Sequence, residues 1–257
     1  MKLKNLPLLL LPALALLLAF IVNLVFAVLR VMPTQTYGEG ETQFVVLGDS
    51  IAAGANLREK QLAYAWIVAG EKGYTLTNFA RSGTESCQLL QRLEKEKKVR
   101  QGVREADVIA VSIGGNDLLH ADEALPLAAS VLRGDYTWAQ PVLEAFRSNF
   151  DRIVGELRAL NPNALLIVQT IYHPSYAGSP LPSLGEDYDA LLSGLNDAIR
   201  GSLSEQPGTF VIADVDAAFQ GQTGLIFIDM FHPSAAGHAV IADVLLDIIN
   251  ETENEMP

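Results

Sequence analysis

One serine and one histidine in this chain stand in settings that suit nucleophilic catalysis. Ser50 follows an apolar run at residues 44–47, and Gly48 permits the tight turn that would place the serine hydroxyl at the edge of a sheet. A serine hydroxyl is a weak nucleophile and needs a base within hydrogen-bond reach. His232 can be that base, because an imidazole accepts and returns a proton near neutral pH. Asp229 lies three residues earlier, where its carboxylate can orient the ring.

Attack on an ester creates an oxyanion, and three groups in the sequence can donate hydrogen bonds to it. They are the main-chain amides of Ser50 and Gly83, at predicted turns, and the side-chain amide of Asn116, which follows an apolar run at residues 108–113. Each residue also has a plainer interpretation: Ser50 as a helix cap, Gly83 as a turn glycine and Asn116 as an Asx-turn residue. Because the groups all follow predicted strands, where open α/β sheets place their sites, their joint occurrence favours ester cleavage.

Further residues are expected to support the site or to contact the substrate. The supporting residues are Asp49, Asn78, Gly115 and Asp117. Asn78 is expected to hold the turn of Gly83, and Asp117 the loop of Asn116, through hydrogen bonds. Tyr172 and His173 open a proline-rich loop at residues 172–184 and are candidates for the substrate pocket, with a purely structural pair as the alternative. The histidines fit no familiar zinc spacing, so neither a metal nor a cofactor is expected.

The candidate residues occur in four short sequence blocks that resemble those of the SGNH, or GDSL-type, lipase/esterase family. The blocks are Gly48-Asp49-Ser50, residues 78–83, Gly114-Gly115-Asn116-Asp117 and Asp229 to Pro233. The resemblance covers residues 44–249. Within the family, the chain is most similar to small bacterial acylhydrolases that are membrane-tethered or secreted. Ile51 stands where the family's nickname has leucine, at a position that carries no chemistry.

What the resemblance implies agrees with the roles proposed above. Ser50 would be the nucleophile, Gly83 and Asn116 the oxyanion donors, and Asp229 with His232 the acid and base. It further implies a flavodoxin-like sandwich and metal-free hydrolysis of acyl esters, thioesters or acetylated sugars, and the family includes lysophospholipases.

Apolar runs of strand length alternate with segments of helical periodicity along most of the chain. The runs are continuous, as in strands buried on both faces, and lie at residues 44–47, 75–79, 108–113, 164–171 and 210–215. The helical segments lie at residues 62–71, 86–96, 118–132, 142–160, 188–203 and 234–249. This alternation predicts an α/β fold, a three-layer α/β/α sandwich around a parallel sheet of about five strands. The charged stretch 95–104 is expected to be a helix end and loop, and the single cysteine, Cys87, a core residue.

The first 33 residues are predicted to anchor the chain in a membrane. Residues 6–29 carry no charge, and a helix of that length spans the roughly 30 Å hydrocarbon core. Lys2 and Lys4 precede it, so the positive-inside rule keeps the N-terminus cytoplasmic and places the remainder outside the cell membrane. The alternative is a signal peptide that is cleaved, which would release a secreted protein.

The rest of the chain predicts one catalytic domain between two short flanking segments. Residues 34–42 are polar and predict a tether, residues 43–250 the hydrolase domain, and residues 251–257 a disordered tail. The net charge of −12 repels phosphate backbones and makes nucleic acid an unsuitable partner. No feature indicates an oligomeric state.

The predicted function is therefore a serine esterase or lipase-type acylhydrolase. Its substrate class would be a small acyl ester, a lipid or an acylated glycan. One alternative is a cell-envelope carbohydrate O-acetylesterase or acyltransferase that uses the same triad. A second alternative, from a different class, is a membrane-anchored binding protein with an inactive hydrolase domain.

Overall fold

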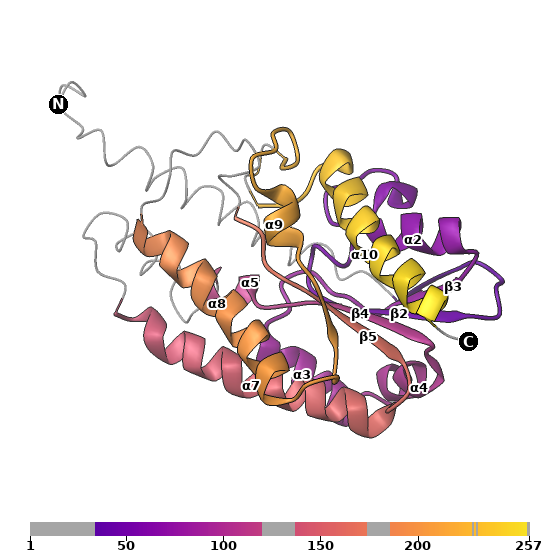
Figure 1. Cartoon of the computed structure of the whole chain (residues 1–257), viewed down its shortest axis with the longest axis horizontal. Coiled ribbons are helices and arrows are strands. Elements are labelled where there is room, and N and C mark those ends of the chain that lie inside the picture. The colour runs from indigo at the N-terminus through magenta and orange to yellow at the C-terminus, as the bar shows by residue number, and fades with distance from the viewer. Residues whose placement is uncertain (1–33, 120–136, 174–185, 228, 230, 256–257) are drawn as a thin grey trace.

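A six-stranded sheet forms the middle layer of the molecule, with strand order β1-β3-β2-β4-β5-β6 (Figure 1). The computed structural model describes residues 34–119, 137–173, 186–227, 229 and 231–255. The strands are β1 (Gln35–Tyr37), β2 (Gln43–Gly48), β3 (Thr75–Asn78), β4 (Val108–Ser112), β5 (Leu165–Gln169) and β6 (Val211–Ala213). Strands β2 to β6 pair in parallel, as predicted. Their sequences are continuously apolar because helices cover both faces of the sheet.

The order of the five parallel strands is that of a flavodoxin-like sheet. In such a sheet the chain leaves the first parallel strand toward one edge of the sheet and later continues toward the other edge. The point where the direction reverses opens a crevice at the carboxyl ends of the two strands that meet there. Here the first of these strands is β2, which pairs with β3 on one side and β4 on the other. Ser50 follows β2 and Asn116 follows β4, so both stand at this crevice.

Helices cover both faces of the sheet and complete the three layers (Figure 1). On one face lie α2 (Tyr64–Lys72), α9 (Val215–Phe219) and α10 (Ala235–Glu255). On the other lie α3 (Ser86–Lys95), α4 (Lys97–Glu105), α5 (Gly115–Leu119), α7 (Ala139–Leu160) and α8 (Glu186–Glu205). A short 3-10 helix, η2 (Lys60–Leu62), precedes α2. Each face buries its own apolar core, with Tyr64 and Phe44 on the first and Phe146 and Phe150 on the second.

The predicted tether and the predicted tail are both wrong in part. Residues Gln35–Tyr37 form β1, which pairs antiparallel with β3 and makes the sheet mixed, because the edge of β3 offers free backbone groups to an extended segment. At the other end, α10 continues to Glu255. Its last turns are held by Glu253, which accepts hydrogen bonds from Lys72 at 2.6 Å and from Tyr74 at 2.5 Å.

Two further expectations on local structure are also wrong. Most of the stretch 95–104 belongs to α4, which buries Val99 and Val103, so one apolar stripe is enough to dock a highly charged helix. Cys87 is exposed, because it lies in the first turn of α3 on the side of the helix opposite the buried Leu89.

Among the described residues, no helix has both the length and the apolarity to cross a bilayer. The predicted anchor at residues 1–33 lies outside the described part of the chain. The same holds for most of the predicted helix 118–132 and for the proline-rich loop beyond His173.

Candidate active site

The turn after β2 presents Ser50 at the carboxyl edge of the sheet. Gly48 has φ +133°, and a Cβ atom there would lie 1.9 Å from the carbonyl oxygen of Ser112, so the turn requires glycine. The Asp49 amide donates to that same carbonyl at 3.2 Å. The Ala55 amide then donates to the Ser50 carbonyl at 2.9 Å. These bonds curl the chain tightly behind the serine and fix where its hydroxyl points.

The structure brings Ser50, His232 and Asp229 into one hydrogen-bonded series. The Nε2 atom of His232 lies 2.9 Å from the Ser50 hydroxyl oxygen, and its Nδ1 atom lies 2.8 Å from Oδ2 of Asp229. Because a carboxylate only accepts hydrogen bonds, Nδ1 carries the proton and Nε2 is free to accept the serine proton. This is the geometry of a serine nucleophile with its base and orienting acid, assembled from the two ends of the domain.

The carboxylate of Asp229 is held as an anion by the turn in which it lies. Its Oδ1 accepts the main-chain amides of Phe231 at 3.1 Å and His232 at 3.0 Å. Burial alone would raise the pKa of Asp229, but the hydrogen bonds from the His232 side chain and from these amides hold it below its ordinary value. An ionised Asp229 is the form that stabilises an imidazolium during attack.

The three predicted oxyanion donors lie at the same sheet edge as the serine. Asn116 is buried, and its Nδ2 donates one hydrogen to the carbonyl of Thr84 at 3.1 Å, which leaves the second for a ligand. Gly83 precedes Thr84 in a turn with φ +78°, so Gly83 and Asn116 are neighbours. Within the described residues, the main-chain amides of Ser50 and Gly83 donate no hydrogen bond. They are available for a developing negative charge.

The sequence that forms this site matches a known family. The model of the GDSL-like Lipase/Acylhydrolase family matches residues 46–240. The chain belongs to this family.

Curated relatives agree with that membership. The spore germination lipase LipC of Bacillus licheniformis is 29% identical over 218 residues, which cover 79% of this chain and 94% of LipC. The uncharacterised protein YpmR of Bacillus subtilis is 28% identical over 180 residues. That match covers 66% of this chain and 64% of YpmR, slightly less than two thirds of its length.

Solved structures share the fold. The lipase Lip_vut3 from a goat rumen metagenome is 25% identical, with a TM-score of 0.63 over 79% of this chain and 95% of the lipase. A phospholipase A1 from Streptomyces albidoflavus, at 21% identity, has a TM-score of 0.61 over 82% of this chain and 99% of its own. Membership in the GDSL-like family makes this protein a hydrolase of ester bonds.

In this acylhydrolase Asn78 supports a different turn from the one expected. Its Nδ2 donates to the carbonyl of Ala52 at 2.8 Å, and its Oδ1 accepts the amide of Ala80 at 2.9 Å. Asn78 therefore joins the end of β3 to the turn that carries Ser50. It reaches the Gly83 segment only through Ala80.

Asp117 ties α5, which also carries Asn116, to the start of α3. Its carboxylate accepts the Ser86 amide at 3.0 Å and the Ser86 hydroxyl, and Asn149 of α7 donates to that hydroxyl at 3.0 Å. Burial raises the pKa of Asp117 to about 6, although the bonds from Ser86 oppose the shift. The two oxyanion segments are thus fastened to each other behind the site.

Of the two adjacent glycines in the third block, only Gly114 has close neighbours. A Cβ atom on Gly114, which has φ +121°, would lie 2.8 Å from the Phe146 ring and 2.9 Å from Ile171. A Cβ atom on Gly115 would have no neighbour within 4 Å. Packing of α7 and of the segment after β5 against this turn therefore favours glycine at position 114, whereas position 115 has room for a side chain.

Tyr172 and His173, the predicted pocket residues, are buried, with 5% and 3% of their surfaces exposed, and they contact segments that carry the site. The Tyr172 ring stacks on Phe219 with a centroid separation of 4.5 Å, and its hydroxyl donates to the carbonyl of Phe231, next to the base. The His173 amide donates to Asp216 at 3.1 Å, and its Nε2 lies 2.7 Å from the carboxylate of Asp189 in α8.

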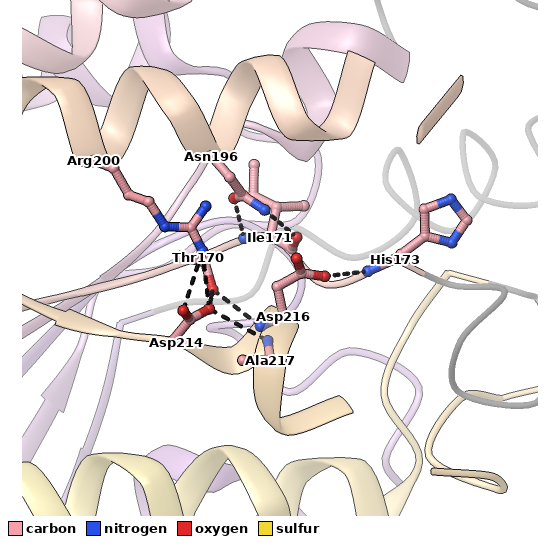
Figure 2. A network of polar contacts seen from close by, with 8 residues as sticks. All are labelled: Thr170, Ile171, His173, Asn196, Arg200, Asp214, Asp216 and Ala217. Atoms are coloured by element: carbon pink, nitrogen blue, oxygen red, sulfur yellow. Dashed lines mark hydrogen bonds and ion pairs between the residues drawn. The ribbon is translucent and has the colours of Figure 1, made fainter. Parts of the chain in front are cut away.

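A polar network fixes the segment that carries these two residues (Figure 2). Asn196 of α8 brackets Ile171, since it accepts the Ile171 amide at 2.8 Å and donates to the Ile171 carbonyl at 2.9 Å. The Thr170 hydroxyl donates to Asp214 at 2.9 Å, and Arg200 donates to the same carboxylate at 3.1 Å (Figure 2). The network anchors the end of β5 to α8 and α9, and Tyr172 carries that anchorage to the His232 loop.

The described part of the chain contains no group of three histidine, cysteine or acidic residues that could hold a metal ion.

His238 is fully buried in α10, where burial lowers its pKa to about 3 and keeps it neutral. Its Nδ1 accepts the Tyr64 amide at 3.4 Å, so it links α10 to α2.

One residue that contacts the site was missed by sequence reasoning. The Nδ2 atom of Asn56 donates a hydrogen bond to Oδ2 of Asp229. The local signal was present, because asparagine six residues after the nucleophile suits the left-handed end of a turn. Its partner lies far away in the sequence, and that pairing follows only from the fold.

Asp49 gives the fold a dependence on pH that a variant can reveal. Burial raises the pKa of Asp49 to about 7, although the Ile51 amide, at 3.0 Å, opposes the shift. The folded state therefore holds this proton more tightly than the unfolded chain between about pH 4 and pH 7, and stability is lost as pH rises through that window. We expect the Asp49→Asn variant, which keeps the acceptor oxygen, to lose much of this dependence.

The measurement is thermal unfolding of wild type and Asp49→Asn at pH 5 and pH 8. The fall in Tm between these pH values should be smaller in the variant by about 3 °C or more, which corresponds to about 1 kcal/mol for a domain of this size. Equal falls in the two proteins would contradict the assignment of this proton to Asp49.

Proposed function

We propose that this protein is a serine esterase of the lipase type that acts through an acyl-enzyme on Ser50. The single observation that carries the proposal is the series from Ser50 through His232 to Asp229, with contacts of 2.9 and 2.8 Å, at the sheet edge that also carries Gly83 and Asn116. A carboxylate, an imidazole and a hydroxyl in this order are what acyl transfer requires.

The reaction proceeds in two steps. As the Ser50 oxygen attacks the ester carbonyl, His232 takes its proton, and the resulting oxyanion accepts hydrogen bonds from the Ser50 and Gly83 amides and from Asn116. The protonated His232 then gives its proton to the leaving alcohol, and the acyl group stays on Ser50. In the second step His232 removes a proton from water, which attacks the acyl-enzyme carbonyl. The protonated His232 then returns that proton to the Ser50 oxygen as the bond to the acyl group breaks, which releases the acid and restores the enzyme.

For the substrate we propose a carboxylic ester whose acyl chain is longer than acetyl, such as a lipid or lysophospholipid. The supporting observation is the similarity to LipC, named a spore germination lipase, at 29% identity over 94% of its length. Lip_vut3, also named a lipase, is 25% identical. We further propose that residues 1–33 anchor the enzyme with its catalytic domain outside the cell membrane, beside such substrates.

Covalent labelling tests the proposal with the full-length protein. We expect a fluorophosphonate probe to add to a single peptide, the one that contains Ser50, because only a base-activated serine attacks phosphorus at a useful rate. Competition by an excess of p-nitrophenyl ester should block the labelling. Folded protein that stays unlabelled would refute the serine mechanism and favour a binding protein.

A substrate series then separates the candidate esters. We expect turnover of p-nitrophenyl esters to rise from acetate to longer acyl chains, and lysophospholipids to be hydrolysed. Preference for acetate, together with release of acetate from acetylated xylan, would reject the lipid substrate and identify a carbohydrate O-acetylesterase instead.

A further inference from the structure

Asn56 connects the two halves of the site behind the catalytic contact. Its side-chain nitrogen donates to Oδ2 of Asp229 and lies 3.1 Å from Nδ1 of His232. The Asp229 carboxylate has only acceptor atoms, so the amide of Asn56 must present its NH2 group to it. The Nδ1 atom of His232 donates to the same carboxylate oxygen at 2.8 Å. Two donors from distant segments therefore share one oxygen.

The backbone of Asn56 is held in a conformation that few residues adopt. Its φ is +66°, and it is the only residue other than glycine in the described part of the chain with a positive φ. That conformation costs about 1 kcal/mol for most residues and less for asparagine. The turn that begins at Ser50 ends here, with the Ala55 amide bonded to the Ser50 carbonyl at 2.9 Å. Lys60 secures the same turn by donating to the carbonyl of Gly54.

We propose that Asn56 is a positioning residue of the hydrolase site, which sets the orientation of Asp229 and limits how strongly its carboxylate retains a proton on His232. The proposal rests on the proposed function, since it assigns a role within that triad. By donating to Oδ2, the amide takes up part of the negative charge that would otherwise stabilise the imidazolium. Loss of this hydrogen bond is therefore expected to favour the protonated form of His232.

Other ionisable groups near His232 are the same in every variant described below. Asp49 at the end of β2 and His238 in α10 both interact electrostatically with His232, and Lys60 lies close to His238. A change in pH dependence between variants at position 56 therefore reports on the Asn56–Asp229 contact itself.

The experiment compares kcat/KM for p-nitrophenyl butyrate against pH in wild type, Asn56→Gly and Asn56→Asp, with Arg58→Ala as the matched control. Glycine keeps the left-handed backbone and removes only the amide, so the fold should be preserved. Asn56→Asp replaces the donor by a second carboxylate beside Asp229. Arg58 lies two residues further on, and its side chain is exposed.

For Asn56→Gly we expect about a tenfold lower kcat/KM at pH 7, with KM changed less than twofold and with the acid limb of the profile moved to higher pH. Asn56→Asp should lose about 100-fold at pH 7 and move the acid limb at least as far, because added negative charge favours the imidazolium. Arg58→Ala should behave as wild type. The Tm of Asn56→Gly should stay within a few degrees of wild type.

Two results would overturn the role of Asn56 alone. One is wild-type activity in Asn56→Gly, and the other is a lower rate with an acid limb that does not move, which would show a merely structural contact. Failure of the wild-type protein itself to hydrolyse esters and to react with fluorophosphonate would instead refute the proposed function, and with it any role of Asn56 in the triad.

Discussion

Replacement of Ser50 by alanine should lower kcat/KM for p-nitrophenyl butyrate by about 10,000-fold or more and abolish fluorophosphonate labelling. In the proposed mechanism the serine oxygen is the atom that forms the acyl bond, so alanine at this position removes the nucleophile. Its side chain contacts the Nε2 atom of His232 at 2.9 Å, a single hydrogen bond whose loss costs about 1 kcal/mol. The Tm should therefore fall by no more than about 4 °C.

A serine far from the site provides the control for this variant. Ser204 is exposed near the end of α8, and Ser204→Ala should retain full activity and labelling. Hydrolysis by Ser50→Ala at more than a few per cent of the wild-type rate, in protein free of wild-type contamination, would reject Ser50 as the nucleophile.

Replacement of Asn116 by alanine should lower kcat by about 100- to 1000-fold, with little change in KM. The loss falls on kcat because the second Nδ2 hydrogen meets full negative charge only when the oxyanion forms. The first hydrogen bonds the buried carbonyl of Thr84 at 3.1 Å, and leaving that carbonyl unpaired costs about 1–3 kcal/mol. A fall in Tm of several degrees is therefore expected as well.

Two comparisons separate the oxyanion role of Asn116 from its structural role. Asn116→Asp should be at least as slow as Asn116→Ala, because a carboxylate repels the oxyanion. Asn163→Ala, at an exposed position just before β5, should leave kcat unchanged. Asn116→Ala with kcat within fivefold of wild type would remove Asn116 from the oxyanion site.

The parallel sheet could be predicted from sequence because its strands are buried on both faces. Runs such as Val108–Ser112 contain no polar interruption until they reach the edge where the chemistry lies, so both the strand and the place of the functional residues follow from hydrophobicity. Strand β1 could not be predicted in this way. Gln35–Tyr37 is largely exposed, and only its pairing with β3 makes it a strand.

The supporting contacts of the site were harder to predict than its reactive groups. Ser50 and His232 are recognisable because their chemistry restricts the residue type at each position. Asn56 and Tyr172 act through single hydrogen bonds to Asp229 and to the Phe231 carbonyl, which are close in space but distant in the sequence. Such pairings depend on loop geometry, for which a single sequence provides no signal.

The helix that follows the nucleophile turn and the helix that follows the base pack against each other on one face of the sheet (Figure 1). His238 joins α10 to α2 through the Tyr64 amide, and Glu253 joins its far end to Lys72. Anyone who engineers this protein should therefore treat the last turns of α10 as part of the catalytic framework. A proteolytic cut or a truncation there would weaken the packing of α10 on α2. The position of His232, which precedes α10, would then be less well fixed although no residue that contacts the substrate had changed.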